Sequence, residues 1–223
     1  MSDSGEAEIL YGQIPERSGR EEFYNALTHF FGLGLSAAGA IALIPLAITE
    51  SPPAIALACC IYIVALMAVF LFSALSHTVS GLPRGMLFRK LDQSFIYLLI
   101  VASWTPFSVA FLPTNWWQGI LLLMWLIAIF GFASKLLLGH RLNQVAIWIY
   151  VALGWTPVMG GLLVTPLLPS PVLFWILAGG IFYTGGTLLL ANDRKSPWFH
   201  PLWHLSVMAG AAAHYFGVLW YVV

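Results

Sequence analysis

Three of the six histidines in this sequence have the spacing expected of metal ligands. His200 and His204 are four residues apart, which on a helix puts both imidazoles on one face, as in helices that hold zinc through two histidines. His77 can supply a third nitrogen, and a water molecule can fill the fourth position. Three histidines with an open position are typical of a catalytic zinc site, in which the ion activates water and polarises a carbonyl group.

Two further polar residues fit the same chemistry. Asp92 can take the proton from the zinc-bound water or orient that water, and Ser73, one helical turn before His77, can hydrogen-bond the water or a substrate. Each residue also has a structural interpretation. Asp92 is a good N-cap for a helix, and Ser73 can bond back to its own helix. The residues alone leave both interpretations open.

The other histidines have less specific roles. Because the residue before a proline avoids the α conformation, Pro201 predicts that His200 is a helix N-cap or lies at a kink. Alternatively, the helix starts at Ser196-Pro197, which puts Pro201 inside its first turns. We expect His29 at the start of a helix, as a reserve ligand or a residue lining the site. His214 is predicted to be a packed, hydrogen-bonded histidine of the core, and His140 to be solvated in a loop. A histidine near a helix end can also be only an interfacial polar residue.

The composition predicts that these residues lie in a membrane protein. The chain has 223 residues, 60% of them hydrophobic, and a mean hydropathy of +0.88. Eight of its 18 charged residues lie in the first 25 positions, so the other 198 residues contain only ten. Ten charged residues are too few for the surface of a soluble globular protein of this size. A soluble enzyme, a disulfide-bonded secreted domain and a nucleic-acid binder are therefore excluded. Cys59 and Cys60 are adjacent in an apolar run and cannot form an ordinary structural bridge.

Seven apolar runs are each about as long as a membrane-spanning helix. The predicted spans are 30–49, 53–76, 94–112, 116–134, 145–164, 172–191 and 201–222. No run has the period-2 alternation of an outer-membrane barrel strand, and the acidic first 25 residues lack the apolar core of a signal peptide. We therefore expect an all-α integral membrane protein. It has a cytoplasmic N-terminal segment, 1–25, at the membrane surface or partly disordered, and a seven-helix domain, 26–223.

The basic residues orient this bundle. All nine lysines and arginines precede the first span or lie in the loops after the second, fourth and sixth spans, and the other loops have none. Because positive residues are retained on the cytoplasmic side, we predict a cytoplasmic N-terminus and an outer C-terminus. This topology brings His77, Asp92, His200 and His204 to the cytoplasmic side from three separate stretches, which favours their joining in one site.

The same residues carry a resemblance to a known family. The motifs Ser73-Ala-Leu-Ser-His77, Lys90-Leu-Asp92 and His200-Pro-Leu-Trp-His204, in this order, resemble the progestin and adiponectin receptor family, and in particular its bacterial hemolysin III branch. Further resemblance to that branch lies in Glu21-Glu22, Asn25, Thr28-His29, Gly154-Trp155 and His214. The resemblance implies a seven-helix bundle with a cytoplasmic N-terminus and zinc held by His77, His200 and His204. It also implies that Asp92 and Ser73 serve the water or the ligands.

The resemblance also implies a function. The wider superfamily includes alkaline ceramidases, so the resemblance points to a zinc-dependent intramembrane hydrolase of a lipid amide or ester, linked to membrane lipid homeostasis. The acyl chain would lie within the bundle, in a bacterial cell (inner) membrane. The alternative is a non-catalytic membrane sensor, or a channel or cytolysin, with a structural zinc site. A wide channel is disfavoured because the spans lack a continuous polar stripe, and the oligomeric state stays open.

Overall fold

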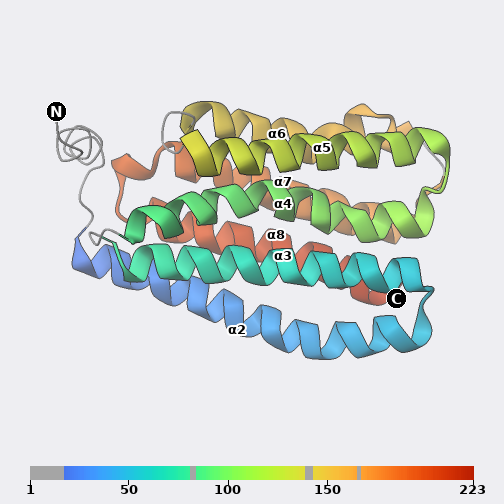
Figure 1. Cartoon of the computed structure of the whole chain (residues 1–223), viewed down its shortest axis with the longest axis horizontal. Coiled ribbons are helices and arrows are strands. Elements are labelled where there is room, and N and C mark those ends of the chain that lie inside the picture. Colours follow the sequence, from blue (N-terminus) through green and yellow to red (C-terminus); the bar gives the residue numbers. More distant parts are fainter. Residues whose placement is uncertain (1–17, 81–83, 139–142, 165–166) are drawn as a thin grey trace.

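Helices make up nearly all of the part of the chain that the structure covers. The computed structural model describes residues 18–80, 84–138, 143–164 and 167–223, and within these ranges it contains no strand. The α-helices of these ranges are α2 (Gly19–Glu50), α3 (Pro53–Thr78), α4 (Gly85–Phe111), α5 (Asn115–Leu138), α6 (Asn143–Met159), α7 (Ser170–Ala191) and α8 (Phe199–Tyr221), with short 3-10 turns η2 (Leu162–Val164) and η3 (Asp193–Lys195). All seven α-helices lie roughly along one axis (Figure 1). The predicted all-α fold class is confirmed.

The surface of the bundle is that of a membrane protein. Five helices, α2, α3, α4, α5 and α7, are long and apolar enough to cross a membrane. The apolar part of α6 is shorter, and three histidines make α8 less apolar. Large apolar side chains face outward: Ile41, Phe130 and Leu137 are 78%, 75% and 77% exposed. Because side chains this exposed and this apolar suit lipid better than water, the chain is a multi-pass integral membrane protein.

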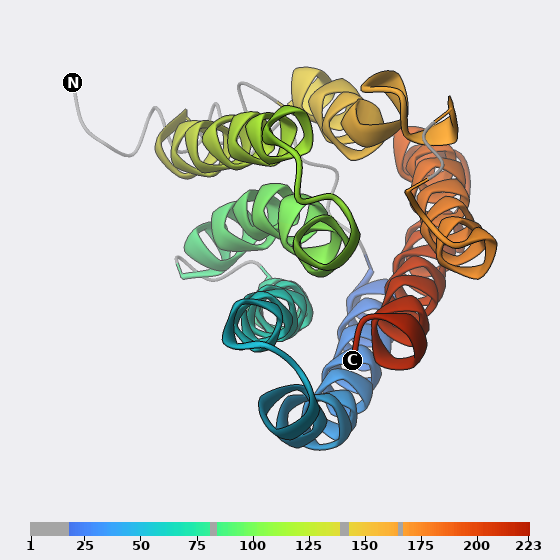
Figure 2. The same ribbon diagram turned by 90° about the vertical axis from the view of Figure 1, so that its right-hand side faces the viewer.

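The first and last helices are neighbours. Each helix packs on the next along the chain, and α8 returns to pack on α2, which closes the circuit seen along the helix axes (Figure 2). α4 contacts α3, α5, α6 and α8, so it is the most central helix. The return of α8 to α2 brings residues from opposite ends of the sequence into contact.

Several helices begin earlier than their apolar runs. The α2 helix starts at Gly19, where Ser18 and Glu21 form a capping box: each side chain bonds the other residue's backbone N–H. Because α4 starts at Gly85, Asp92 lies two turns inside it, and the interpretation of Asp92 as an N-cap is wrong. Hydropathy marks only the part of a helix that suits lipid, whereas the helix continues through polar turns beyond it.

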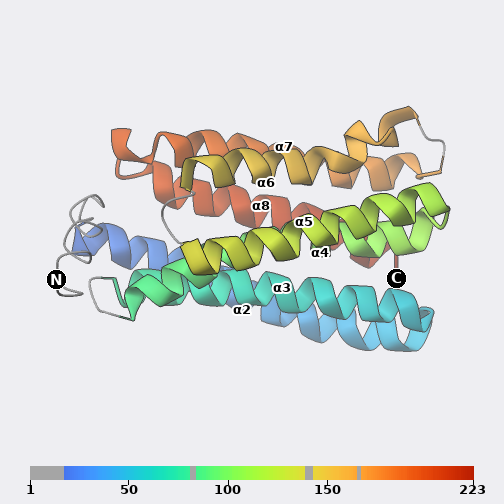
Figure 3. The same ribbon diagram turned by 45° about the horizontal axis from the view of Figure 1, so that its top comes forward.

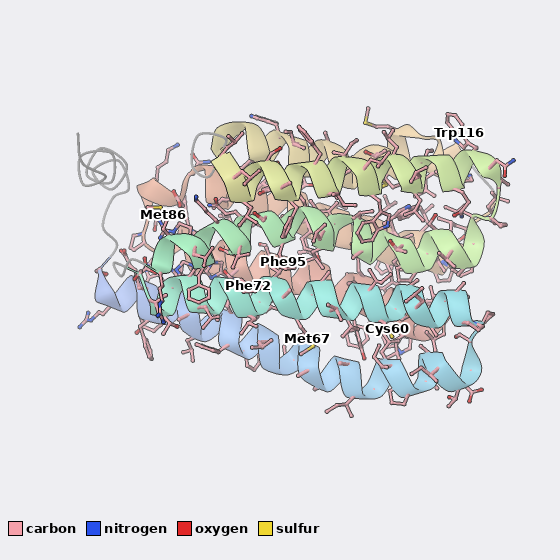
Figure 4. The ribbon with its side chains drawn as sticks, in the orientation of Figure 1. Cys60, Met67, Phe72, Met86, Phe95 and Trp116 are labelled. Carbon is pink, nitrogen blue, oxygen red and sulfur yellow. The ribbon has the colours of Figure 1, made fainter. Side chains whose placement is uncertain are left out.

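The helix termini that carry the predicted site residues lie at one end of the bundle. The starts of α2, α4 and α8 and the end of α3 lie together there (Figures 1 and 3). Along α3, Cys60, Met67 and Phe72 follow one another toward this end (Figure 4). The basic residues Arg20, Arg84 and Arg89 belong to the same helix starts, as the charge pattern predicts. The assignment of this end to the cytoplasm stays a prediction.

Candidate metal centre

Four histidines gather at this end. His77 is in the last turn of α3, His200 and His204 are in the first two turns of α8, and His29 is in the third turn of α2. The ring centres of His77, His200 and His204 are 5.2, 5.3 and 4.5 Å apart (77–200, 77–204 and 200–204). His29 is 3.8 Å from His204 and 6.1 Å from His77 by the same measure. The structure thus brings together the three histidines that the sequence singles out as ligands, and places His29, the expected reserve ligand or lining residue, beside them.

The start of α8 explains how two of them share a face. Phe199 begins the helix, with Trp198 at the cap position, so His200 and Pro201 are both in the first turn. A proline is tolerated there because its missing N–H would have no partner within the helix. His200 is therefore not the N-cap, and Pro201 lies inside the first turn, as the alternative of an earlier helix start predicts. His200 and His204 are one helical turn apart, with rings 4.5 Å from each other.

The ring spacing fits a metal ion held by the three predicted histidines. Two imidazoles bound to one zinc ion at about 2.0–2.1 Å in a tetrahedral site have ring centres about 5 Å apart, close to the 4.5–5.3 Å among His77, His200 and His204. A second measure favours a different trio: one ring nitrogen from each of His29, His77 and His204 lies within 4.8 Å of the others. The His29 ring, however, lies 3.8 Å from that of His204 and 6.1 Å from that of His77, which is too close to the one and too far from the other for a tetrahedral ion shared by these three residues.

Hydrogen bonds hold the Nδ1 side of the His77 and His204 rings. Nδ1 of His77 donates to Oε2 of Glu22 over 2.6 Å. Nδ1 of His204 lies 3.0 Å from Oγ1 of Thr28, and that hydroxyl itself donates to the Asn25 carbonyl over 2.8 Å. A hydroxyl has one proton, so Nδ1–H of His204 is the donor to Thr28. In both rings the proton is therefore on Nδ1, and Nε2 carries the lone pair, which is the atom that a metal would use.

The third predicted histidine has a similar neighbour. Nδ1 of His200 lies 3.4 Å from Oδ2 of Asp193, in the turn η3 just before α8. Metal-binding histidines commonly turn their second nitrogen to an oxygen acceptor, which fixes the ring and its tautomer. Glu22, Thr28 and Asp193 provide that acceptor here, and no sequence argument gave them this role. Glu22 and Thr28 belong to the motifs that resemble the hemolysin III branch, so the sequence does mark them, although not as acceptors. Nothing in the sequence marks Asp193.

An acidic group lies close to this cluster. Ser73 is buried on α3, one turn before His77, and its side chain is hydrogen-bonded to Asp92 on α4. The two residues that the sequence predicts to handle water or substrate are therefore direct partners. Their contact places a carboxyl group beside the turn of α3 that precedes His77.

One histidine of the described residues, His214, lies apart from the cluster. His214 is ten residues beyond His204 on α8, and its Nε2 donates to the Ile176 carbonyl over 3.2 Å. Its ring also contacts Phe107 and Tyr183. The prediction of a packed, hydrogen-bonded core histidine is confirmed. The interpretation of His140 as a solvated loop residue lies outside the described residues.

Known proteins match nearly the whole chain. The family described as "Haemolysin-III related" matches residues 18–215. The protein named "Hemolysin-3" of Bacillus cereus is 34% identical over 209 residues, 92% of this chain and 93% of its own length. The "Hemolysin-3 homolog" of Bacillus subtilis is 30% identical over 92% of this chain and 95% of its own. The human "Monocyte to macrophage differentiation factor" is 28% identical over 73% of this chain and 69% of its own.

Proposed function

Because the chain belongs to the haemolysin-III related family and gathers imidazoles beside an acidic residue, we propose that it is a zinc-dependent hydrolase of an amide or ester bond in an acyl lipid. His77, His200 and His204 would hold the metal through Nε2. When bound, zinc supplies Lewis acidity, which polarises a carbonyl group and eases the deprotonation of water. The observation that carries the proposal is the orientation of the three rings, whose Nδ1 atoms face oxygen acceptors.

The chain's own residues have distinct tasks in this proposal. Asp92 accepts a proton from the attacking water and passes it to the leaving group. The Ser73 hydroxyl donates to the Asp92 carboxylate and keeps it aimed at the reacting group. Glu22, Thr28 and Asp193 hold the histidine rings in position. The acyl chain would lie among the apolar side chains of the bundle, in the cell (inner) membrane of a bacterium, where cleavage would adjust the lipid composition.

A channel or cytolysin is the alternative that the relatives' names suggest. Such a function needs side chains that offer polar groups to a water path. The buried hydroxyls of Ser36, Ser94, Ser103 and Thr105 instead donate to carbonyls of their own helices. Because these hydroxyls already donate to backbone carbonyls, they are poorly suited to line a water path. This argues against a channel and thereby favours the enzyme. A lipid sensor with a structural zinc site stays as the second alternative.

Removing and restoring the metal tests the proposed function. We expect zinc-loaded protein in detergent to release fatty acid from a bacterial lipid extract, stripped protein to release none above background, and added zinc to restore release. Magnesium is expected not to restore it, because that ion prefers oxygen ligands. Fatty acids are measured by mass spectrometry. Release that persists in stripped protein would contradict a zinc enzyme, and zinc-loaded protein that releases none would favour the sensor.

The Glu22 carboxylate is expected to strengthen zinc binding through His77. In Glu22→Gln the acceptor facing Nδ1 of His77 loses its charge, and zinc affinity should fall about 10–100-fold. Affinity is measured by competition with a chromophoric chelator. Glu21→Gln is the matched control, since the Glu21 side chain bonds the Ser18 backbone. Equal affinities in the two variants would mean that Glu22 does not support the ligand.

A further inference from the structure

Two buried residues of α2 have no hydrogen-bond partner within the described part of the chain. Asn25 is 0% exposed and His29 is 3% exposed. Both side-chain polar atoms of Asn25 and both ring nitrogens of His29 lack a partner. Buried polar groups are nearly always hydrogen-bonded, and leaving them unpaired lowers stability. Four such atoms, one helical turn apart, therefore need an explanation.

These residues face the candidate metal centre. Glu22, Asn25 and His29 lie three and four residues apart, so they share one face of α2. Both ends of this face touch the cluster: Glu22 bonds His77, and the His29 ring is 3.8 Å from that of His204. Asn25 lies between them. The unpaired atoms therefore belong to the wall that α2 contributes to the site.

The unpaired atoms define the chemistry of a ligand. An asparagine amide offers both donors and an acceptor, and a neutral imidazole offers one of each. Neither carries a charge of its own, so an anion or a cation would be matched only in part. A neutral group that both donates and accepts hydrogen bonds, such as a hydroxyl or an N–H amide, would satisfy both residues. A methyl ester, which only accepts, would leave acceptor atoms unpaired.

We propose that Asn25 and His29 form a subsite that binds a hydroxyl or amide group of the lipid, beside the metal ligands. The subsite rests on the proposed function, because it positions the substrate of that same site. It accounts for polar atoms that reduce stability in the empty protein and gain partners when lipid binds. Strained or unsatisfied groups of this kind occur at functional sites, where binding takes precedence over stability.

Binding of two fluorescent lipids tests the subsite without relying on turnover. The probes are the ethanolamide and the methyl ester of one NBD-labelled dodecanoic acid, and the protein is zinc-loaded Asp92→Asn, which would preserve the probes. We expect Asn25→Leu to weaken binding of the ethanolamide about tenfold or more and that of the methyl ester less than about threefold. Binding is measured by fluorescence anisotropy. Asn25→Ala serves as a second variant that removes the same atoms.

Thermal stability gives an independent measure. Without added lipid, Asn25→Leu is expected to raise the melting temperature by about 2–4 °C, because it removes unpaired buried atoms. Ser36→Ala is the matched control: this buried serine of α2 donates to Leu33, so its loss should neither stabilise the protein nor change the binding of either probe. A lower melting temperature in both Asn25 variants would mean that Asn25 is a structural partner, and would overturn the proposal.

Other outcomes are also decisive. If both probes bind the Asn25 variants as well as they bind the parent, the two residues hold water and the subsite is wrong. If His29→Leu loses zinc, His29 is a metal ligand and the subsite is equally wrong. If the subsite results hold but the zinc-loaded wild type cleaves no lipid, the hydrolase fails while the lipid-binding subsite stands.

Discussion

Replacing His204 with alanine is expected to reduce the zinc content of the purified protein from about one ion per chain to a trace. His204 is central to the cluster, since its ring contacts those of His29, His77 and His200. Loss of a residue that only supports a ligand typically weakens zinc binding 10–100-fold, and loss of the ligand itself should exceed about 100-fold. The measurement is elemental analysis after equilibration against buffered zinc.

The chain offers a matched control on the same helix. His214→Ala also removes an imidazole from α8, but His214 bonds Ile176 and lies outside the cluster, so the variant should keep its zinc. The double variant His77→Ala, His204→Ala should hold no more zinc than the single one. An equal zinc content in the wild type and the double variant would contradict the proposed metal centre, and with it the proposed hydrolase function.

The spacing of residues within single helices predicts much of the candidate site. The H-x-x-x-H pattern on α8 and the S-x-x-x-H pattern on α3 each fix two side chains within one helix, and the structure keeps both arrangements. The meeting of α3 with α8 was inferred from membrane topology, which assigns each helix end to a side. The spacing of residues within a helix and the side of the membrane at which a helix ends can both be predicted without knowing which helices are in contact.

The supporting residues depended on contacts that a sequence does not display. Thr28 reaches His204 across 176 residues, and Glu22 reaches His77 across 55. Both contacts require that α2 pack against α3 and α8. They also require that α2 begin at Gly19, well before the apolar run, and the Ser18–Glu21 capping box was the available signal for that start. Because the apolar run begins at position 30, the sequence predicts His29 at a helix start, whereas it lies in the third turn of α2 and against His204.

Replacing Asp92 with asparagine is expected to lower the rate of fatty acid release about 10²–10⁴-fold while zinc binding is retained. Asparagine has the same size and can still accept a hydrogen bond from Ser73, but it cannot take up a proton. Initial rates on the lipid extract and zinc content are measured in the same samples. The matched control is Ser94→Ala on the same helix, because Ser94 is buried and donates to the Lys90 carbonyl.

The hydrogen bond between Ser73 and Asp92 sharpens this prediction. If Ser73 acts only by aiming the carboxylate, Ser73→Ala alone should slow release about tenfold, the usual effect of losing one hydrogen bond to a charged group. In the Asp92→Asn background the same change should have little further effect, because residues that act as one unit are not additive. Additive losses would mean that Ser73 contacts the substrate itself. Loss of zinc from Asp92→Asn would instead make the carboxylate a metal ligand, and a wild-type rate would exclude it from proton transfer.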